Sequence, residues 1–298
     1  MTQHDAQLDE MSVAEITAAM NQLDFAVPVA IRQALPAITA AIEAAEPGFA
    51  AGGRLVYVGA GTSGRLGVLD AAECPPTFHT DPDRVVGVIA GGPDALVAAV
   101  EGAEDDSAAG AGAVDALDVG PLDTVVGVAA SGRTPYVLGA LERARQREAV
   151  TVSLSCVSSA ELSRVAAWPI EIPVGPEIIA GSTRLKAGTV TKQVLNMIST
   201  ALMVRTGRTY GNLMVEVAAT NAKLRARATG LVVQIAGVDP DTARSALESA
   251  GLEVKTAVVM LLREVDATTA RELLEAAGGR LGWVIGGSGP GRPGLGPA

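Results

Sequence analysis

The sequence predicts an α/β fold in which helices flank a parallel, five-stranded sheet, with N-terminal helices before it and a small helical subdomain after it. Two observations predict this class. Five apolar runs of strand length follow residue 54 and alternate with helical patterns. Strands that are apolar on both faces and separated by helices are typical of parallel sheets covered on both sides. The chain has 298 residues and is 48 % hydrophobic, so it can build a sizeable core.

The N-terminal region is expected to be helical. Ser12 and Glu15 have the spacing of a capping box, which predicts a helix that begins there. A second helical pattern covers residues 24–46. We expect Pro28 and Pro36 to interrupt it, because proline removes a backbone donor inside a helix.

Strands and helices then follow in order. The strands are expected near residues 55–58, 85–89, 124–130 and 150–155, with a weaker run near 169–174. Short helices are expected over 241–250, 254–265 and 268–277, separated by Gly251 and Asp266. The predicted domains are N-terminal helices over 1–50, the α/β domain over 51–228, a helical subdomain over 229–280 and a tail over 281–298. We expect the tail to be disordered because it is rich in glycine and proline and cannot bury a core.

A glycine-rich turn follows the first strand and opens a helix. Residues 59–65 read Gly-Ala-Gly-Thr-Ser-Gly-Arg. Glycines let the backbone approach a ligand closely, and the first N–H groups and the dipole of a helix attract an anion. The glycine spacing also fits a dinucleotide fingerprint, but that site needs an acidic residue where this chain has Ala90, Gly91 and Gly92. A phosphate on a smaller ligand therefore fits better.

Two further turns carry similar residues. Ser131-Gly-Arg133 repeats the order of Ser63-Gly-Arg65 after another apolar strand, and a third hydroxyl-rich turn covers residues 181–188. Hydroxyl and backbone N–H groups can bind phosphate or sugar oxygens. The candidate binding residues are Thr62, Ser63, Ser131, Arg133, Thr134, Ser182, Thr183 and Lys186. Serine and threonine are also favoured helix N-caps, and this alternative stays open for all three turns.

Two glutamates are candidate acids. Glu73 lies just before Pro75 and Pro76, which we expect to end its helix and to fix it beside the glycine turn. Glu104 follows the second strand in a helical pattern that puts it on one face with Glu101. Carboxyl groups can act as general acid and general base for chemistry next to a carbonyl carbon. For Glu104, a solvated acidic face is the alternative.

Composition excludes several classes of function. A net charge of −10 without basic runs argues against nucleic acid as the partner, although a local phosphate site remains compatible. Two cysteines make no disulfide framework, and two histidines make no metal cluster, so we predict no metal. The polar N-terminus does not resemble a signal peptide, and we find no apolar run of the roughly 18 residues that span a membrane. We therefore expect a cytoplasmic protein without a membrane partner.

The turns and the glutamates together resemble a known family. Residues 59–65, 130–135 and 181–189 are similar to the sugar isomerase (SIS) fold. A larger set of segments resembles specifically the N-acetylmuramic acid 6-phosphate etherases, namely residues 59–67 joined to 72–77, with 100–105, 130–136 and 210–215. The resemblance covers about residues 10–277 and is highly specific as a combination, although the glycine spacing alone is not.

The resemblance implies cleavage of the D-lactyl ether of N-acetylmuramic acid 6-phosphate by a cytoplasmic homodimer without a cofactor, in the recycling of cell-wall sugars. It implies that the sugar ring opens, C2 loses a proton, lactate leaves C3 and water adds back. It assigns Glu73 as the acid for the lactyl oxygen and Glu104 as the second acid or base. Two alternatives on the same fold stay open: a non-catalytic sugar-phosphate sensor, like the related regulator of glucokinase, and an aldose–ketose isomerase.

Overall fold

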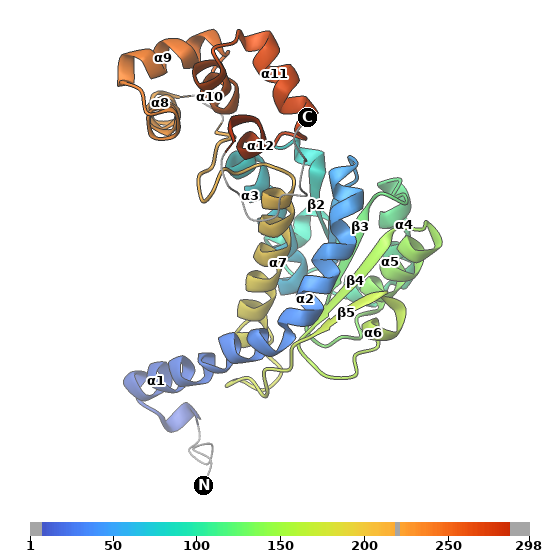
Figure 1. The fold of residues 1–298 in the computed structure, drawn as a ribbon. Coiled ribbons are helices and arrows are strands. Elements are labelled where there is room, and N and C mark those ends of the chain that lie inside the picture. The colour runs from blue at the N-terminus through green and yellow to red at the C-terminus, as the bar shows by residue number, and fades with distance from the viewer. Residues whose placement is uncertain (1–7, 218–220, 287–298) are drawn as a thin grey trace. The chain divides into compact units, whose positions relative to one another are not determined.

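The computed structural model describes residues 8–217 and 221–286 and confirms the predicted parallel sheet (Figure 1). The strands lie in the order β2–β1–β3–β4–β5, and each neighbouring pair is parallel. All five predicted runs form strands, which are β1 (Leu55–Gly59), β2 (Val85–Ile89), β3 (Thr124–Val128), β4 (Val150–Ser155) and β5 (Trp168–Glu171). The carboxyl ends of adjacent strands β1 and β3 therefore lie at one edge of the sheet.

Strands β1 and β3 are buried along their whole length, as expected for parallel strands between two layers of helices. Their side chains alternate between the two faces. Val56 and Val58 join a core cluster with Val137 of helix α5 (Pro135–Gln146), whereas Tyr57 reaches Asp70 of helix α3 (Gly61–Phe78) on the opposite face. Figure 1 shows α2 (Ala26–Ala50) and α7 (Lys186–Arg205) on one side of the sheet. It shows α4 (Ser107–Ala116), α5 and α6 (Leu162–Val165) on the other.

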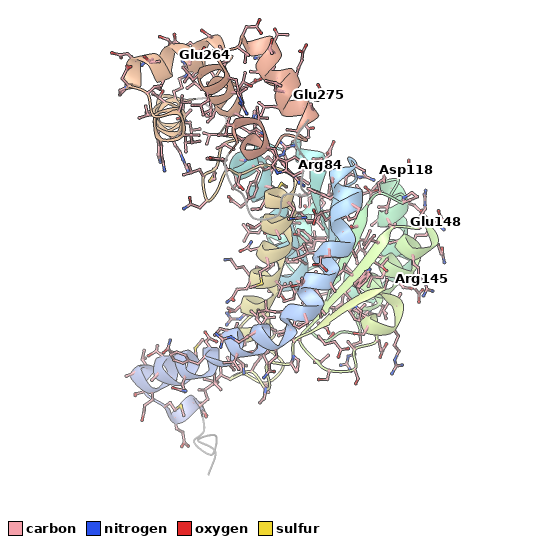
Figure 2. All side chains as sticks on the ribbon, in the orientation of Figure 1. Arg84, Asp118, Arg145, Glu148, Glu264 and Glu275 are labelled. Carbon is pink, nitrogen blue, oxygen red and sulfur yellow. The ribbon has the colours of Figure 1, made fainter. Side chains whose placement is uncertain are left out.

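The chain divides into two compact units. The sheet unit comprises Met1–Ala71 and Val85–Ser199, and the helical unit comprises Ala72–Arg84 and Thr200–Ala298. The first part of the chain, up to residue 205, contributes the helices α1 (Val13–Asp24), α2 (Ala26–Ala50), α3 (Gly61–Phe78), α4 (Ser107–Ala116), α5 (Pro135–Gln146), α6 (Leu162–Val165) and α7 (Lys186–Arg205). Short 3₁₀ turns are η1 (Leu8–Glu10), η2 (Pro82–Arg84), η3 (Pro93–Leu96) and η4 (Ala103–Asp105). Charged side chains such as Asp118, Arg145 and Glu148 lie on the outside of the sheet unit (Figure 2).

The capping box of α1 is confirmed. The Ser12 hydroxyl accepts a hydrogen bond from the Glu15 N–H, and the Glu15 carboxylate accepts one from the Ser12 N–H. The predicted interruption of α2 is wrong, since α2 continues through Pro36. Pro28 lies in the first helical turn, where no intrahelical donor is needed. The buried side chains of α2 pack on β3, β4 and β5, and this burial outweighs the lost backbone bond.

The same helices correct the expectation about membrane-spanning length. Among the described residues, the stretch Val13–Ala50 is long and apolar enough to cross a membrane by length and composition, with a mean hydropathy of 1.5 in its most apolar window. Composition carries little weight by itself, because packed core helices pass the same test. One face of α2 packs against β3, β4 and β5, and 28 % of the apolar window is buried.

Two expectations about the candidate acids are also wrong. The helix α3 does not end at Glu73 but passes through Pro75 and ends at Phe78, because a proline removes one backbone bond while its φ remains helical. Glu104 lies in η4 rather than in an α-helix, so the predicted helical face with Glu101 does not form. Gly102 has a left-handed φ of 74°, which breaks the helical pattern immediately before η4.

In the described part of the helical unit, five helices follow α7. They are α8 (Ala222–Ala236), α9 (Pro240–Ser249), α10 (Val254–Arg263), α11 (Ala267–Ala276) and α12 (Leu281–Ile285), and one buried cluster joins them. The three helices predicted between residues 241 and 277 are confirmed. The predicted domain boundary at 228 falls inside α8, and residues 281–285 form α12 instead of the start of the predicted tail. Residues 287–298 of that tail lie outside the described residues.

Candidate functional site

The glycine turn places the start of α3 at the carboxyl edge of the sheet. Gly61 has a φ of 52°, which favours glycine where the chain turns from β1 into α3. Gly64 lies so close to the strand ends that a Cβ there would be 2.7 Å from the Gly59 carbonyl oxygen and 2.6 Å from Cγ1 of Ile89. The turn therefore brings the first N–H groups of α3 to the edge where ligands of parallel sheets bind.

The second turn follows β3, directly beside the first. Thr134 occupies the N-cap position of α5, but its side chain makes no capping hydrogen bond. Ser131 and Arg133 are exposed, and Thr134 is half-buried. The capping alternative is thus not met by the Thr134 hydroxyl, which leaves this hydroxyl available to a ligand.

The third turn lies beside the first. A Cβ on Gly188 would be 3.7 Å from both Cγ2 of Thr62 and the carbonyl oxygen of Thr183. Ser182 is half-buried and Thr183 is exposed. Residues from the first and third turns, which are more than 100 positions apart in the chain, therefore lie close together in the sheet unit.

The start of α7 already carries an anion from the chain itself. The Glu177 carboxylate accepts hydrogen bonds from the N–H groups of Lys186 (3.1 Å) and Ala187 (2.9 Å). The buried Lys186 ammonium donates to the Val174 carbonyl oxygen at 2.8 Å. Glu177 was missed in the sequence, although an acidic residue ahead of a helix start is the signal that could have found it.

A cavity of about 220 Å³ opens between the start of α3 and the segment of residues 95–104. Gly61, Arg65, Glu101 and Glu104 contribute to its lining, together with several alanines. Both glutamates are exposed, and η4 contacts α5, the helix that follows the second turn. The structure thus brings Glu104 to the same cavity as the glycine turn.

Glu73 lies elsewhere on α3. It is exposed and follows Gly61 by twelve residues, or about 18 Å along an α-helix. Glu73 belongs to the helical unit and does not line the cavity that contains Glu104. Within one chain, the two candidate acids therefore do not share that cavity.

The buried carboxylate of Asp70 links α3 to neighbouring elements of the sheet unit. Asp70 accepts hydrogen bonds from the Tyr57 hydroxyl at 2.8 Å, the Asn196 amide at 2.5 Å and the Ser199 hydroxyl at 3.2 Å. These donors come from β1 and α7, so one side chain ties three elements of the sheet unit together. Sequence patterns do not indicate this group, because Asn196 and Ser199 are 126 and 129 positions away from Asp70 in the chain.

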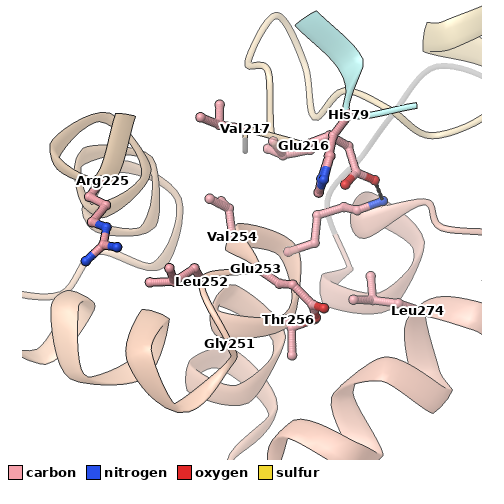
Figure 3. Close-up of a pocket in the computed structure, with 12 residues that line it drawn as sticks. His79, Glu216, Val217, Arg225, Gly251, Leu252, Glu253, Val254, Thr256 and Leu274 are labelled. Atoms are coloured by element: carbon pink, nitrogen blue, oxygen red, sulfur yellow. Dashed lines mark hydrogen bonds and ion pairs between the residues drawn. The ribbon is translucent and has the colours of Figure 1, made fainter. Parts of the chain in front are cut away.

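The helical unit has a cavity of its own, of about 420 Å³ (Figure 3). The Lys255 ammonium forms an ion pair with Glu216 there and donates to the Gly279 carbonyl oxygen at 2.8 Å. His79, Leu252 and Val254 also line this cavity. None of the residues predicted to bind or to catalyse lies in its lining.

Both cysteine thiols, those of Cys74 and Cys156, are buried. Burial raises the pKa of the Cys156 thiol to about 12, so it stays protonated near neutral pH. Within residues 8–217 and 221–286, no three His, Cys, Asp or Glu side chains form a group that could hold a metal ion.

Known proteins resemble this chain at three levels. A protein-family model described as the glucokinase regulatory protein N-terminal SIS domain matches residues 36–145. An N-acetylmuramic acid 6-phosphate etherase of Mycolicibacterium smegmatis is 53 % identical over 86 % of each chain, and one of Cutibacterium acnes is 55 % identical over 86 % of this chain and 84 % of its own. A solved phosphoheptose isomerase of Neisseria gonorrhoeae matches with a TM-score of 0.49 and 16 % identity, covering 63 % of this chain and 97 % of its own, and this likeness is too weak to add to the others.

Proposed function

Because this chain belongs to the N-acetylmuramic acid 6-phosphate etherase family, we propose that it cleaves the D-lactyl ether of N-acetylmuramic acid 6-phosphate. The products are N-acetylglucosamine 6-phosphate and D-lactate, and the reaction serves the recycling of cell-wall amino sugars. The observation that carries the proposal is the high identity to two etherases over most of the chain. The cavity that joins the glycine turn to Glu104 supports it.

The three turns anchor the phosphorylated end of the sugar in this proposal. Thr62 and Ser63 stand at the first N–H groups of α3, while Ser131, Arg133 and Thr134 stand at the start of α5. Ser182 and Thr183 add hydroxyl groups from the third turn. Lys186 contributes only if its ammonium leaves the Val174 carbonyl oxygen. Binding energy at the phosphate holds C2 and C3 of the sugar where the acids can act on them.

The proposed reaction is an elimination followed by a hydration. Ring opening makes C1 an aldehyde, which acidifies the hydrogen on C2. A base takes that proton, the C3–O bond breaks, and the lactyl oxygen receives a proton as lactate leaves. Water then adds its oxygen to C3 of the unsaturated aldehyde, and C2 regains a proton. The steps need only general acids and bases, each typically accelerating a reaction by about 10²–10⁴-fold.

Glu73 and Glu104 are the acids that we assign to these steps. Glu73 donates the proton to the departing lactyl oxygen, and Glu104 acts as the second acid or base, toward water. The exposure of both carboxyl groups supports this assignment, since a reacting sugar can reach them.

We further propose a homodimer in the cytoplasm, in which an active site takes Glu104 from one copy and Glu73 from the other. The separation of about 18 Å along α3 between Gly61 and Glu73 supports this arrangement, because one hexose phosphate does not extend that far. Helix α1 also supports it, since none of its residues is buried within one chain. Analytical ultracentrifugation tests the dimer, and a monomer at assay concentration would contradict it. Fractionation of cells tests the location, and recovery with the membranes would contradict it.

Release of D-lactate tests the activity directly. The purified protein is incubated with N-acetylmuramic acid 6-phosphate and, separately, with the same sugar lacking the phosphate. We expect D-lactate only from the phosphorylated sugar. Thermal stabilisation by the sugar phosphate without lactate would favour the sensor instead, and conversion of an aldose phosphate to its ketose would favour the isomerase.

A further inference from the structure

We propose that Arg65 is a positioning residue that holds the segment carrying Glu104, rather than a ligand of the substrate phosphate. The proposal rests on the proposed function for the role of Glu104, but its geometry does not. Arg65 belongs to the first Ser-Gly-Arg sequence, where an arginine next to an anion-binding turn suggests phosphate binding.

The Arg65 side chain is instead directed at the backbone of a neighbouring segment. Its Nε donates to the Leu96 carbonyl oxygen at 3.0 Å, and a terminal nitrogen donates to the Ala98 carbonyl oxygen at 3.1 Å. A guanidinium holds its donors in a rigid, planar fork, so it can hold two carbonyl groups of one segment at once. The first turn of α3 is thereby tied to the chain that leads to η4.

Besides Arg65, local backbone hydrogen bonds hold this segment, such as those from the N–H groups of Val97 and Ala98 to the Asp94 carbonyl oxygen. Its residues from Leu96 to Gly102 are exposed, and Val97 is 91 % exposed. Packing at its far end is tighter, because a Cβ on Gly91 would lie 2.8 Å from Cβ of Val100. The two hydrogen bonds of Arg65 therefore stabilise the part of the segment that apolar burial does not.

The surroundings of Arg65 disfavour a phosphate there. Glu101 and Glu104 line the same cavity, and a phosphate between them would meet like charges. Arg133 on the second turn is exposed and, within the described residues, has no ion pair, which makes it the better phosphate ligand. The two arginines of the two similar turns thus take different tasks.

Hydrogen exchange and kinetics test the proposal together. Arg65→Lys keeps the charge but loses the fork, and Arg65→Gln loses both. Arg145→Gln, an exposed arginine of α5 (Figure 2), is the matched control. In the Arg65 variants, we expect the amide hydrogens of Val97, Ala98 and Ala103 to exchange with solvent about tenfold faster than in wild type. We also expect kcat to fall about tenfold, with KM within about twofold of wild type. The loss should be smaller in Arg65→Lys, and the control should match wild type.

Three results would overturn the proposal. A large rise in KM with unchanged exchange would make Arg65 a phosphate ligand. Unchanged amide exchange with unchanged kinetics would show that the two hydrogen bonds of Arg65 do not stabilise the segment that carries Glu104. Faster exchange with normal kcat would show that the segment does not position Glu104. If wild type releases no lactate, the proposed function fails, whereas the exchange result still decides whether Arg65 holds the segment.

Discussion

The two units of this chain each contain a cavity, and the two cavities are built in different ways. In the sheet unit, glycines, alanines and backbone groups form most of the lining, with Arg65 and two glutamates placed among them. In the helical unit, longer side chains line the cavity, and the ion pair between Lys255 and Glu216 crosses part of it. A ligand site lined mainly by backbone groups requires small residues, so that the ligand can approach the backbone closely. A cavity that contains an ion pair requires both charged side chains of that pair.

This difference predicts where each unit is sensitive to substitution. The sheet unit depends on glycines that admit close contact and on a buried carboxylate that joins three elements. The helical unit depends on a charged pair that is partly shielded from water. Substitutions matched between the units can therefore test whether the two constructions differ as the structure indicates.

The largest effect is expected at Asp70 in the sheet unit. Asp70→Ala leaves the donors of Tyr57, Asn196 and Ser199 without their carboxylate in a buried site, which should lower the free energy of unfolding by about 3 kcal/mol. Urea denaturation measures the change. Asp118→Asn is the control, because Asp118 is exposed and asparagine tolerates its left-handed φ of 46°. A loss below about 1 kcal/mol in Asp70→Ala would contradict this account of α3.

The matching substitution in the helical unit is Lys255→Met. It removes the ammonium that forms an ion pair with Glu216 and binds two backbone carbonyl oxygens, so it should cost about 2 kcal/mol. Arg208, at 3.8 Å, remains as a second partner of Glu216. High salt should narrow the gap between this variant and wild type, because the ion pair is partly screened. A gap that stays the same at high salt would contradict the role of the ion pair in the helical unit.

Glycines give a comparison of opposite sign. Gly64→Ala would place its Cβ 2.7 Å from the Gly59 carbonyl oxygen, so we expect a loss of about 2 kcal/mol and weaker binding of sugar phosphate. Gly230→Ala in α8 meets no atom within 4 Å and should stabilise the protein by about 0.5 kcal/mol. Thermal denaturation measures both. The account would be wrong about close packing at the turn if both variants gained stability.

The smallest effect concerns pH and the sheet unit. Burial raises the pKa of Asp123, but hydrogen bonds from Arg54 and from the Gly120 N–H outweigh it and hold the pKa below its ordinary value of 3.8. A lowered pKa in the folded state stabilises the protein above the ordinary value, and this contribution is lost as the pH falls through the lowered pKa. Asp123→Asn should therefore be less stable than wild type by about 1 kcal/mol at pH 7, with the gap narrowing below pH 3.8. A gap that widens on acidification would contradict the sign.

The sheet could be predicted because buried parallel strands are continuous apolar runs, as in β1 and β3. The short helices α9, α10 and α11 could be predicted because their apolar periodicity is clear and acidic N-caps such as Asp239 and Asp266 mark their starts. The effect of proline on α2 was overestimated. A local rule considers only the one backbone hydrogen bond that proline removes, whereas the packing of α2 on the sheet stabilises the helix by more than that loss.

The candidate site was predictable in its turns but not in its connections. Sequence spacing places Ser63 and Ser131 after strands that turn out to be neighbours. Sequence spacing does not predict which two carbonyl groups Arg65 contacts, nor which donors surround Asp70. Both sets of contacts join residues that are separated in the chain and meet only in the folded protein. The contact of Glu177 with the start of α7 depends on the path of the loop between them, which sequence patterns do not predict.

Mixing two inactive variants tests the central claim most directly, namely that Glu104 of one copy acts together with Glu73 of another. Glu73→Ala and Glu104→Ala are each expected to release almost no D-lactate while still binding N-acetylglucosamine 6-phosphate. Co-expressed and purified as a mixed dimer through two different tags, they should regain about half of the wild-type activity per dimer, because one of the two sites then contains both glutamates. A mixed dimer as inactive as its parents would contradict the shared site, and full activity of either single variant would contradict the assignment of that glutamate.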